Sequence, residues 1–180
     1  SIQESIHVFI NAGLKDYLIK NIKPTLNILE IGFGTGLNAL LTIEENKHLN
    51  KKIFYHTLEP FPIPISLAEQ INFKEINPTI FSQIHEFQWS KKFSINKNFT
   101  FLKENIKLED FSSTNKYDII YYDAFGPNSQ QEMWETNLFK KLYSLLNNCG
   151  TLVTYCAKGQ VRRDLQNTGF TMERLPGPKG

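Results

Sequence analysis

The sequence contains little cysteine, no long apolar run and almost no net charge. Its two cysteines, Cys149 and Cys156, are too few for a disulfide framework in 180 residues and lack the spacing of metal ligands, so we expect no metal. No run of about 18 apolar residues occurs, which argues against a membrane-spanning helix and a membrane partner. The first residues show no basic segment followed by an apolar one, so no signal peptide is predicted. We expect a cytoplasmic protein.

The remaining composition is that of one globular domain. Hydrophobic residues make up 41% of the chain and charged residues 21%, which argues against disordered, collagenous and coiled-coil chains. The net charge is only +2, but residues 158–180 hold five basic and two acidic side chains. A basic terminus on a neutral body is compatible with a nucleic-acid partner, and equally with an ordinary solvated surface.

Short apolar runs alternate with helical patterns along the chain. Strands are predicted at residues 27–31, 53–58, 98–106, 117–122, 151–155 and 170–174. Helices are predicted at residues 5–20, 37–48, 132–147 and 159–167. Strands joined by crossover helices form a mostly parallel sheet with helices on both faces. We therefore predict a single α/β domain over residues 1–180 with a Rossmann-like fold, in which residues 1–24 form an N-terminal helical extension.

Two regions depart from a simple doubly wound sheet. Residues 60–98, between the second and third strands, are more than one crossover helix needs and contain two short apolar-periodic pieces, 66–73 and 79–89. Such an insertion is either packed decoration or a cap over the substrate, and the sequence leaves both open. A sheet of this type normally ends with a further strand after residues 170–174, so we expect the final strand to be missing from these 180 residues.

The sharpest local signal is a predicted strand, three alternate glycines and a predicted helix. Glycine allows a ligand to approach the backbone closely. A dinucleotide-binding fingerprint, G-x-G-x-x-G, would require glycine where Leu37 stands. The form E-x-G-x-G-x-G instead resembles motif I of the S-adenosylmethionine-dependent methyltransferases, whose cofactor has no pyrophosphate to place at a helix N-terminus. The residues of this motif that we expect to bind the cofactor are Glu30, Gly32, Phe33, Gly34, Gly36 and Asn38.

Two further residues are candidates for cofactor binding. Glu59 ends the second predicted strand, where a carboxylate can accept hydrogen bonds from both ribose hydroxyls. The third expected element is an acidic or amide side chain after the third strand, facing the adenine amino group. Asn105 is the candidate, with Glu104 and Asp110 as rivals.

The fourth predicted strand ends at Asp123, which is the catalytic candidate. Ligands of open parallel sheets bind outside the carboxyl ends of the strands, so Asp123 is expected beside the reactive end of the cofactor. A primary amine, with a pKa of about 10.4, is mostly protonated at neutral pH and must lose a proton before methylation. The Asp123 carboxylate could orient the amine and take that proton; a turn or helix-capping role is the alternative. Phe125 is expected to wall the pocket, and Pro127 to fix the turn.

Taken together, these motifs resemble the methyltransferase domain of the tRNA 5-methylaminomethyl-2-thiouridine biosynthesis enzymes. The resemblance covers nearly the whole chain, through residues 3–10, 29–38, 123–134 and 155–178. It implies S-adenosylmethionine-dependent N-methylation of the 5-aminomethyl-2-thiouridine at the tRNA wobble position. In two places the chain departs from the family. Gln131 stands where the family often has proline, and the acidic residue after the third strand is replaced by the region of Glu104 and Asn105.

The resemblance also implies partners. In many bacteria the domain is fused to an FAD-dependent oxidase that first removes a carboxymethyl group. These 180 residues cannot hold such a domain, so we expect a stand-alone form and a separate oxidase upstream. The expected substrate partner is the tRNA anticodon loop, whose unpaired wobble base can enter a pocket at little unstacking cost.

Aromatic and basic residues near the predicted strand ends are candidates for tRNA contact. Four aromatic residues could either stack on a base or be ordinary core residues: Phe33, Phe125, Trp134 and Tyr155. Three basic residues could either bind phosphates or form an ordinary solvated helix face: Lys158, Arg162 and Arg163. The four histidines form no cluster in the sequence and are interpreted as structural or surface residues.

Two other functions remain open. A methyltransferase for a small amine or a protein, including an aminopropyl-transferring variant, would use the same glycine motif and Asp123 but would not bind tRNA. An RNA-binding module with a vestigial cofactor site is the non-enzymatic alternative, and the intact glycine motif argues against it.

Overall fold

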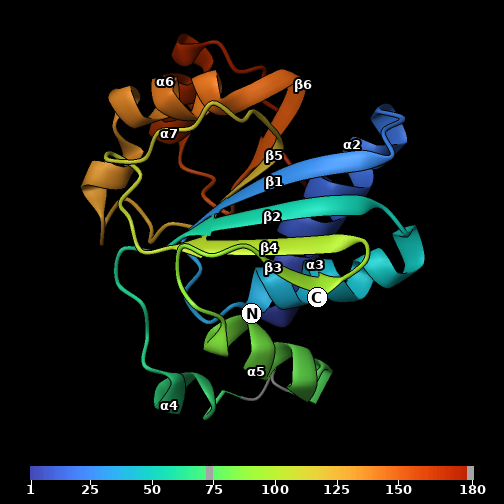
Figure 1. Ribbon diagram of the computed structural model, residues 1–180. Helices are drawn as coiled ribbons and strands as arrows, with labels where there is room; N and C mark the ends of the chain where they lie inside the picture. The colour runs from blue at the N-terminus through green and yellow to red at the C-terminus, as the bar shows by residue number, and fades with distance from the viewer. Residues whose placement is uncertain (72–74, 178–180) are drawn as a thin grey trace.

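A computed structural model describes residues 1–71 and 75–177. Phe73, in the first apolar piece of the insertion, and Pro178, in the last family-like segment, lie outside the described residues. The described chain is built around a six-stranded sheet of order β3-β4-β2-β1-β5-β6, with helices on both faces (Figure 1). Every neighbouring pair of strands is parallel except β3 and β4. The predicted α/β Rossmann-like fold is confirmed.

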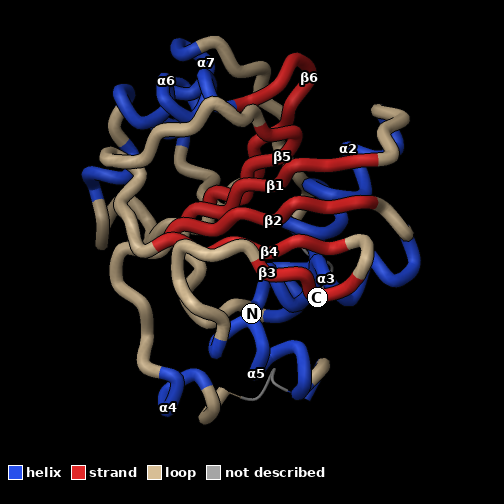
Figure 2. Tube along the Cα trace, viewed as in Figure 1, coloured by secondary structure: helices blue, strands red, loops and turns tan. Residues whose placement is uncertain are grey.

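Five of the six strands overlap predicted ones. These are β1 (Thr25–Ile31), β2 (Lys52–Leu58), β4 (Phe99–Glu104), β5 (Tyr117–Tyr122) and β6 (Leu146–Val153). The sixth, β3 (Phe93–Asn96), is an antiparallel edge strand that the sequence analysis missed. The carboxyl ends of the parallel strands lie on the same side of the sheet, where Figure 2 shows the loops that follow β1, β2 and β4. Side chains at these ends therefore converge.

Helices cover each face of the sheet. One face carries the N-terminal helical stretch, made of α1 (Ile2–Ser5), the π-helical η1 (Ile6–Lys15) and α2 (Asp16–Lys20), together with α3 (Leu37–Leu49). The other face carries the 3₁₀ turn η3 (Gln131–Trp134), α6 (Thr136–Leu145) and α7 (Gly159–Thr168). Every residue of β5 is buried, because both faces of the sheet are covered there.

Among its described residues, the segment between β2 and β3 carries two short α-helices. They are α4 (Ile65–Ala68) and α5 (Pro78–Glu86). Asn77 caps α5, since its side-chain oxygen accepts the N–H of Ile80 at 3.1 Å, and Pro78 occupies the first turn, where no intrahelical donor is needed. Figure 1 shows α5 beneath the edge of the sheet that β3 and β4 form, next to α3, with α4 farther out.

One predicted element is wrong, and a second is only partly confirmed. Residues 170–174, expected to be a strand, form neither helix nor strand. The N–H of Phe170 instead donates to the carbonyl of Leu165 at the end of α7, and its ring packs edge-on against Tyr143 of α6, with ring centroids 5.1 Å apart. The chain is therefore held against the helices instead of extending the sheet. The helix predicted over 132–147 is also interrupted, because α6 spans only Thr136–Leu145 and β6 follows at once.

Candidate active site

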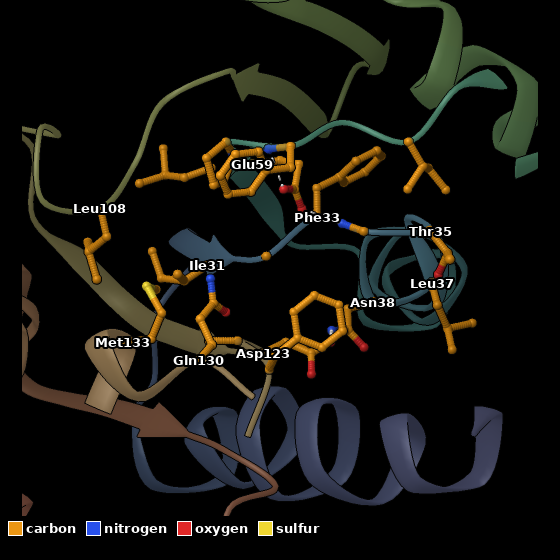
Figure 3. Close-up of a pocket in the computed structure, with 18 of the residues that line it drawn as sticks. Ile31, Phe33, Thr35, Leu37, Asn38, Glu59, Leu108, Asp123, Gln130 and Met133 are labelled. Atoms are coloured by element: carbon orange, nitrogen blue, oxygen red, sulfur yellow. Dashed lines mark hydrogen bonds between the residues drawn. The ribbon is translucent and has the colours of Figure 1, made fainter. Parts of the chain in front are cut away.

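A cavity of about 680 Å³ lies at the carboxyl ends of the parallel strands (Figure 3). Its walls come from the N-terminal helical stretch and from the loops that follow β1, β2, β4 and β5. This is the edge at which open α/β sheets bind their ligands. The structure therefore brings together the regions in which the sequence places the cofactor and catalytic residues.

The glycine-rich loop leaves β1 along one wall of this cavity. Gly32 has a φ of +93°, and a Cβ atom there would lie 2.7 Å from the carbonyl oxygen of Asp123, so a side chain is excluded by both conformation and space. Gly34 has a φ of +49°, and a Cβ there would meet no atom within 4 Å. Its backbone is therefore open to a ligand. The N–H of Gly36 donates to the carbonyl of Phe33 at 2.8 Å and closes the turn into α3.

Glu59 connects this loop to the segment that follows β2. One oxygen of its buried carboxylate accepts the N–H of Gly34 at 2.9 Å, and the other accepts the N–H of Phe61 at 2.8 Å. Each carboxylate oxygen has a second acceptor site. Glu59 can thus shape the loop and still accept hydrogen bonds from a ligand in the cavity.

Asp123 lies across the cavity from Glu59, beside Asn38 (Figure 3). The side-chain amide of Asn38 donates to Oδ2 of Asp123 at 2.8 Å. Burial raises the pKa of the Asp123 carboxyl to about 6, while the hydrogen bond from Asn38 opposes the rise and the charge of Glu4 adds to it. At neutral pH Asp123 is therefore mostly ionised, with a pKa close enough to 7 for a general base.

Glu30 does not line the cavity. It is fully buried, and neither of its carboxyl oxygens has a hydrogen-bond partner among the described residues. Burial raises the pKa of its carboxyl to about 8, and the neighbouring polar side chains of Thr57, Tyr55 and Asn38 oppose this rise only in part. Glu30 is therefore mostly protonated at neutral pH. It lies behind the site, next to Asn38, and does not face a ligand.

The loop after β5 forms the mouth of the cavity. Phe125 is 75% exposed there and lines the cavity, as does Tyr155, whose hydroxyl donates to the carbonyl of Ala124 at 2.7 Å. Trp134 is not among the lining residues. Its ring is buried beneath the loop, and its N–H donates to the carbonyl of Phe125 at 2.7 Å. Trp134 thus supports the loop from the core.

The basic candidates and Pro127 lie outside the cavity wall. The ammonium of Lys158 donates to the side-chain oxygen of Asn128 at 2.5 Å, which joins the start of α7 to the loop at the cavity mouth. Arg162 and Arg163 are exposed near the start of α7, and Arg163 donates to Gln160 at 2.8 Å. These side chains are on the surface, accessible to a large substrate.

The wall after β4 differs from the expectation. The amide of Asn105 donates to the backbone carbonyls of Glu59 and Pro60, at 2.9 and 3.2 Å, and does not line the cavity. Asn105 therefore supports the segment that carries Glu59. The apolar surface beyond it was missed from the sequence, since residues outside periodic elements give no signal. It is made by Ile106 and Leu108 of this loop, together with Met133 of η3.

The described residues contain neither a metal-binding cluster nor a membrane-spanning helix. Within residues 1–71 and 75–177, no group of three or more His, Cys, Asp or Glu side chains is placed to hold a metal ion. No helix in the same residues has the length and apolar character needed to cross a membrane.

The fold, the glycine-rich loop, and the acidic side chains of Glu59 and Asp123 on opposite sides of the cavity are those of an S-adenosylmethionine-dependent methyltransferase. A family profile described as S-adenosyl-L-methionine-dependent methyltransferase matches residues 68–179, and the chain belongs to this family. Its relatives include the tRNA 5-methylaminomethyl-2-thiouridine biosynthesis bifunctional protein MnmC of Leptospira borgpetersenii, with 31% identity over 98% of this chain and 29% of that protein. MnmC of Campylobacter hominis is 27% identical over 85% of this chain and 24% of that protein.

The chain thus spans less than a third of these curated relatives. Among solved structures, MNMC2 from Aquifex aeolicus superposes with a TM-score of 0.74 and 18% identity, covering 94% of this chain and 55% of that one. The two chains share their fold.

Proposed function

We propose that this chain N-methylates the 5-aminomethyl group of the wobble 5-aminomethyl-2-thiouridine in tRNA, using S-adenosylmethionine. The observation that carries the proposal is the placement of Asp123, a partly buried carboxylate held by Asn38. It lines the same cavity as the exposed ring of Phe125. The relatedness to MnmC proteins of two genera supports the choice of substrate.

The residues that line the cavity fit the cofactor. The open backbone at Gly34 allows close approach, and Glu59 is placed to accept the ribose hydroxyls. Leu108 and Met133 offer an apolar surface for the adenine ring, and Asp123 a negative charge for the positively charged end. When bound there, S-adenosylmethionine supplies a methyl group activated by its positively charged sulfur.

The side chains of this chain prepare the amine. Asn38 occupies Oδ2 of Asp123, and we assign Oδ1 to the incoming ammonium, which the carboxylate orients and from which it accepts one proton. The nitrogen is then left with the lone pair that methyl transfer requires. Phe125 is placed to stack on a base entering the mouth, and Lys158, Arg162 and Arg163 to bind phosphates of the anticodon loop.

The supply of the amine is part of the same proposal. The relatives are named bifunctional, and the chain covers only 29% of the Leptospira protein. We propose that an FAD-dependent oxidase, separate or on the same polypeptide, first removes a carboxymethyl group and so exposes the primary amine. A tRNA that still carries the carboxymethylaminomethyl group should then accept no methyl group from this chain until the oxidase has acted.

The test is methyl transfer from labelled S-adenosylmethionine to tRNA that lacks the final methyl group, followed by nucleoside mass spectrometry. The full-length protein is compared with its Asp123→Asn variant, and Asp110→Asn serves as a matched control because Asp110 is exposed outside the cavity. We expect label in 5-methylaminomethyl-2-thiouridine, reduced at least about 100-fold by Asp123→Asn and unchanged by the control. Intact cofactor binding with no labelled tRNA would refute the substrate and direct the search to small amines.

A further inference from the structure

A buried lysine lies behind the glycine-rich loop, on the side away from the main cavity. Lys103 of β4 is 1% exposed, and no described carboxylate pairs with it. Its ammonium donates to the carbonyls of Ile84 and His85, at 3.0 and 2.6 Å, and lies over the rings of Trp89 and Phe33, at 4.6 and 5.8 Å from their centroids. Carbonyls at a helix C-terminus and aromatic faces both attract a cation.

These contacts attach the last turn of α5 to the sheet. Ile84 and His85 belong to that turn, and Lys103 belongs to β4. A neutral side chain at position 103 would leave the two carbonyls without this donor in a buried place, which costs free energy. The buried lysine therefore fixes where the end of α5 lies, and with it the side chain of His85.

His85 in turn contacts the glycine-rich loop. Its Nε2 lies 3.1 Å from the backbone carbonyl of Thr35, and its ring packs against Phe33 and Phe81, with centroids 5.3 and 4.6 Å apart. Because a carbonyl only accepts hydrogen bonds, Nε2 carries the proton and donates it. His85 is buried, so it makes this hydrogen bond from the interior of the protein.

At Gly36 the glycine-rich loop packs closely against the end of α5. A Cβ atom built on Gly36 would lie 3.1 Å from Ile84 and 3.2 Å from Nε2 of His85. On the cavity side, Glu59 accepts the N–H of Gly34. The loop is thus held between Glu59 at its front and His85 at its back.

We propose that His85 is a positioning residue for methyl-donor binding: fixed by Lys103 through α5, it holds the carbonyl of Thr35 and so keeps the glycine-rich loop in its binding conformation. The part of the insertion that contains α5 then acts as a support for the cofactor loop. The proposal rests on the cofactor site and is independent of which amine accepts the methyl group.

The test measures binding of S-adenosylmethionine and S-adenosylhomocysteine by calorimetry on the full-length protein. His85→Phe keeps an aromatic ring but removes the donor, and His85→Gln places an amide N–H near the position of Nε2. We expect His85→Phe to raise both dissociation constants about 5- to 10-fold, since a lost neutral hydrogen bond weakens an arrangement by about this factor. His85→Gln should bind the cofactor within about 2-fold of the wild-type affinity. In both variants, kcat at saturating cofactor should equal that of the wild type.

Lys103→Met supplies an independent measurement, because it removes the anchor and leaves His85 in place. Weakened cofactor affinity with an unchanged KM for the amine substrate would support the proposal. His48→Phe, a change at an exposed position on α3, is the control for the substitution itself. The proposal would be overturned if folded His85→Phe and Lys103→Met bound the cofactor with wild-type affinity. It would also be overturned if His85→Phe and His85→Gln weakened cofactor binding equally. Cofactor affinities that change as expected in a protein that does not methylate tRNA would refute the proposed substrate and leave this inference standing.

Discussion

Replacing Glu30 by glutamine tests whether the buried carboxyl behind the site is uncharged. Glu30 lies on β1, paired with Thr57 of β2 and Tyr121 of β5, and is fully buried. Burial raises the pKa of its carboxyl from about 4.5 to about 8, so the group carries a proton at neutral pH. Glutamine has the same shape and no charge. We therefore expect Glu30→Gln to stabilise the protein at alkaline pH.

The magnitude follows from proton linkage. The unfolded chain releases the Glu30 proton near pH 4.5, whereas the folded chain keeps it to about pH 8. Burial of Glu30 therefore does not lower the free energy of unfolding below pH 4.5. The free energy of unfolding decreases as the pH rises between these two values, and the decrease is complete above about pH 8. A difference of about 3.5 pKa units corresponds to about 5 kcal/mol at most. The gain from Glu30→Gln should thus be several kcal/mol at pH 8.5 and close to zero at pH 5.

Urea unfolding at pH 5, 6.5 and 8.5 measures this difference, with Glu135→Gln, at an exposed position, as the control. Taking the difference between variant and wild type removes the contributions of titrating groups that do not interact with Glu30. Cofactor affinity at pH 7 should change by less than about 3-fold, because Glu30 does not line the cavity. A variant that is destabilised equally at all three pH values, or that loses cofactor binding while folded, would contradict the neutral, buried carboxyl.

Three further results are expected. Because burial raises the pKa of Asp123 to about 6, kcat/KM for the amine should fall about tenfold per pH unit below pH 6, where the base is protonated; a flat profile down to pH 5 would exclude Asp123 as the base. Gly32→Ala should lower the free energy of unfolding by about 1–3 kcal/mol and weaken cofactor binding, since its Cβ would lie 2.7 Å from a carbonyl oxygen at positive φ; denaturant unfolding and calorimetry test both. Phe125→Ala should leave Tm unchanged, because the ring is 75% exposed, and raise KM for tRNA but not for the cofactor.

Local patterns predicted most of the sheet and the position of the cavity. Buried apolar runs identified five strands, and the shared edge of parallel strands predicted that Gly32, Glu59 and Asp123 would come together. The edge strand β3 and the course of residues 170–174 depend on tertiary contacts, such as the packing of Phe170 on Tyr143. Such contacts between distant segments leave no periodic signal in the sequence.

The direction of individual side chains was the least predictable part of the site. Trp134 and Asn105 lie near the cavity, yet both make hydrogen bonds to backbone carbonyls that support its loops. The position of Glu30 could have been inferred, since it shares a face of β1 with Ile28, two residues earlier, and that face packs against helices. His85 and Lys103 offered no such clue, because their contacts join segments far apart in the sequence.

Asn38 connects two carboxyl groups that have different charge states. Its amide donates to Asp123, and its side chain also lowers the pKa of the Glu30 carboxyl. Two ionised carboxylates this close in a buried place would repel each other, and the more deeply buried one keeps its proton. Asp123 can then stay charged and take a proton from the amine. The same chemical change, carboxyl to amide, should therefore have opposite consequences on the two sides of Asn38: Glu30→Gln should retain activity and gain stability above pH 8, whereas Asp123→Asn should abolish methyl transfer in a folded protein.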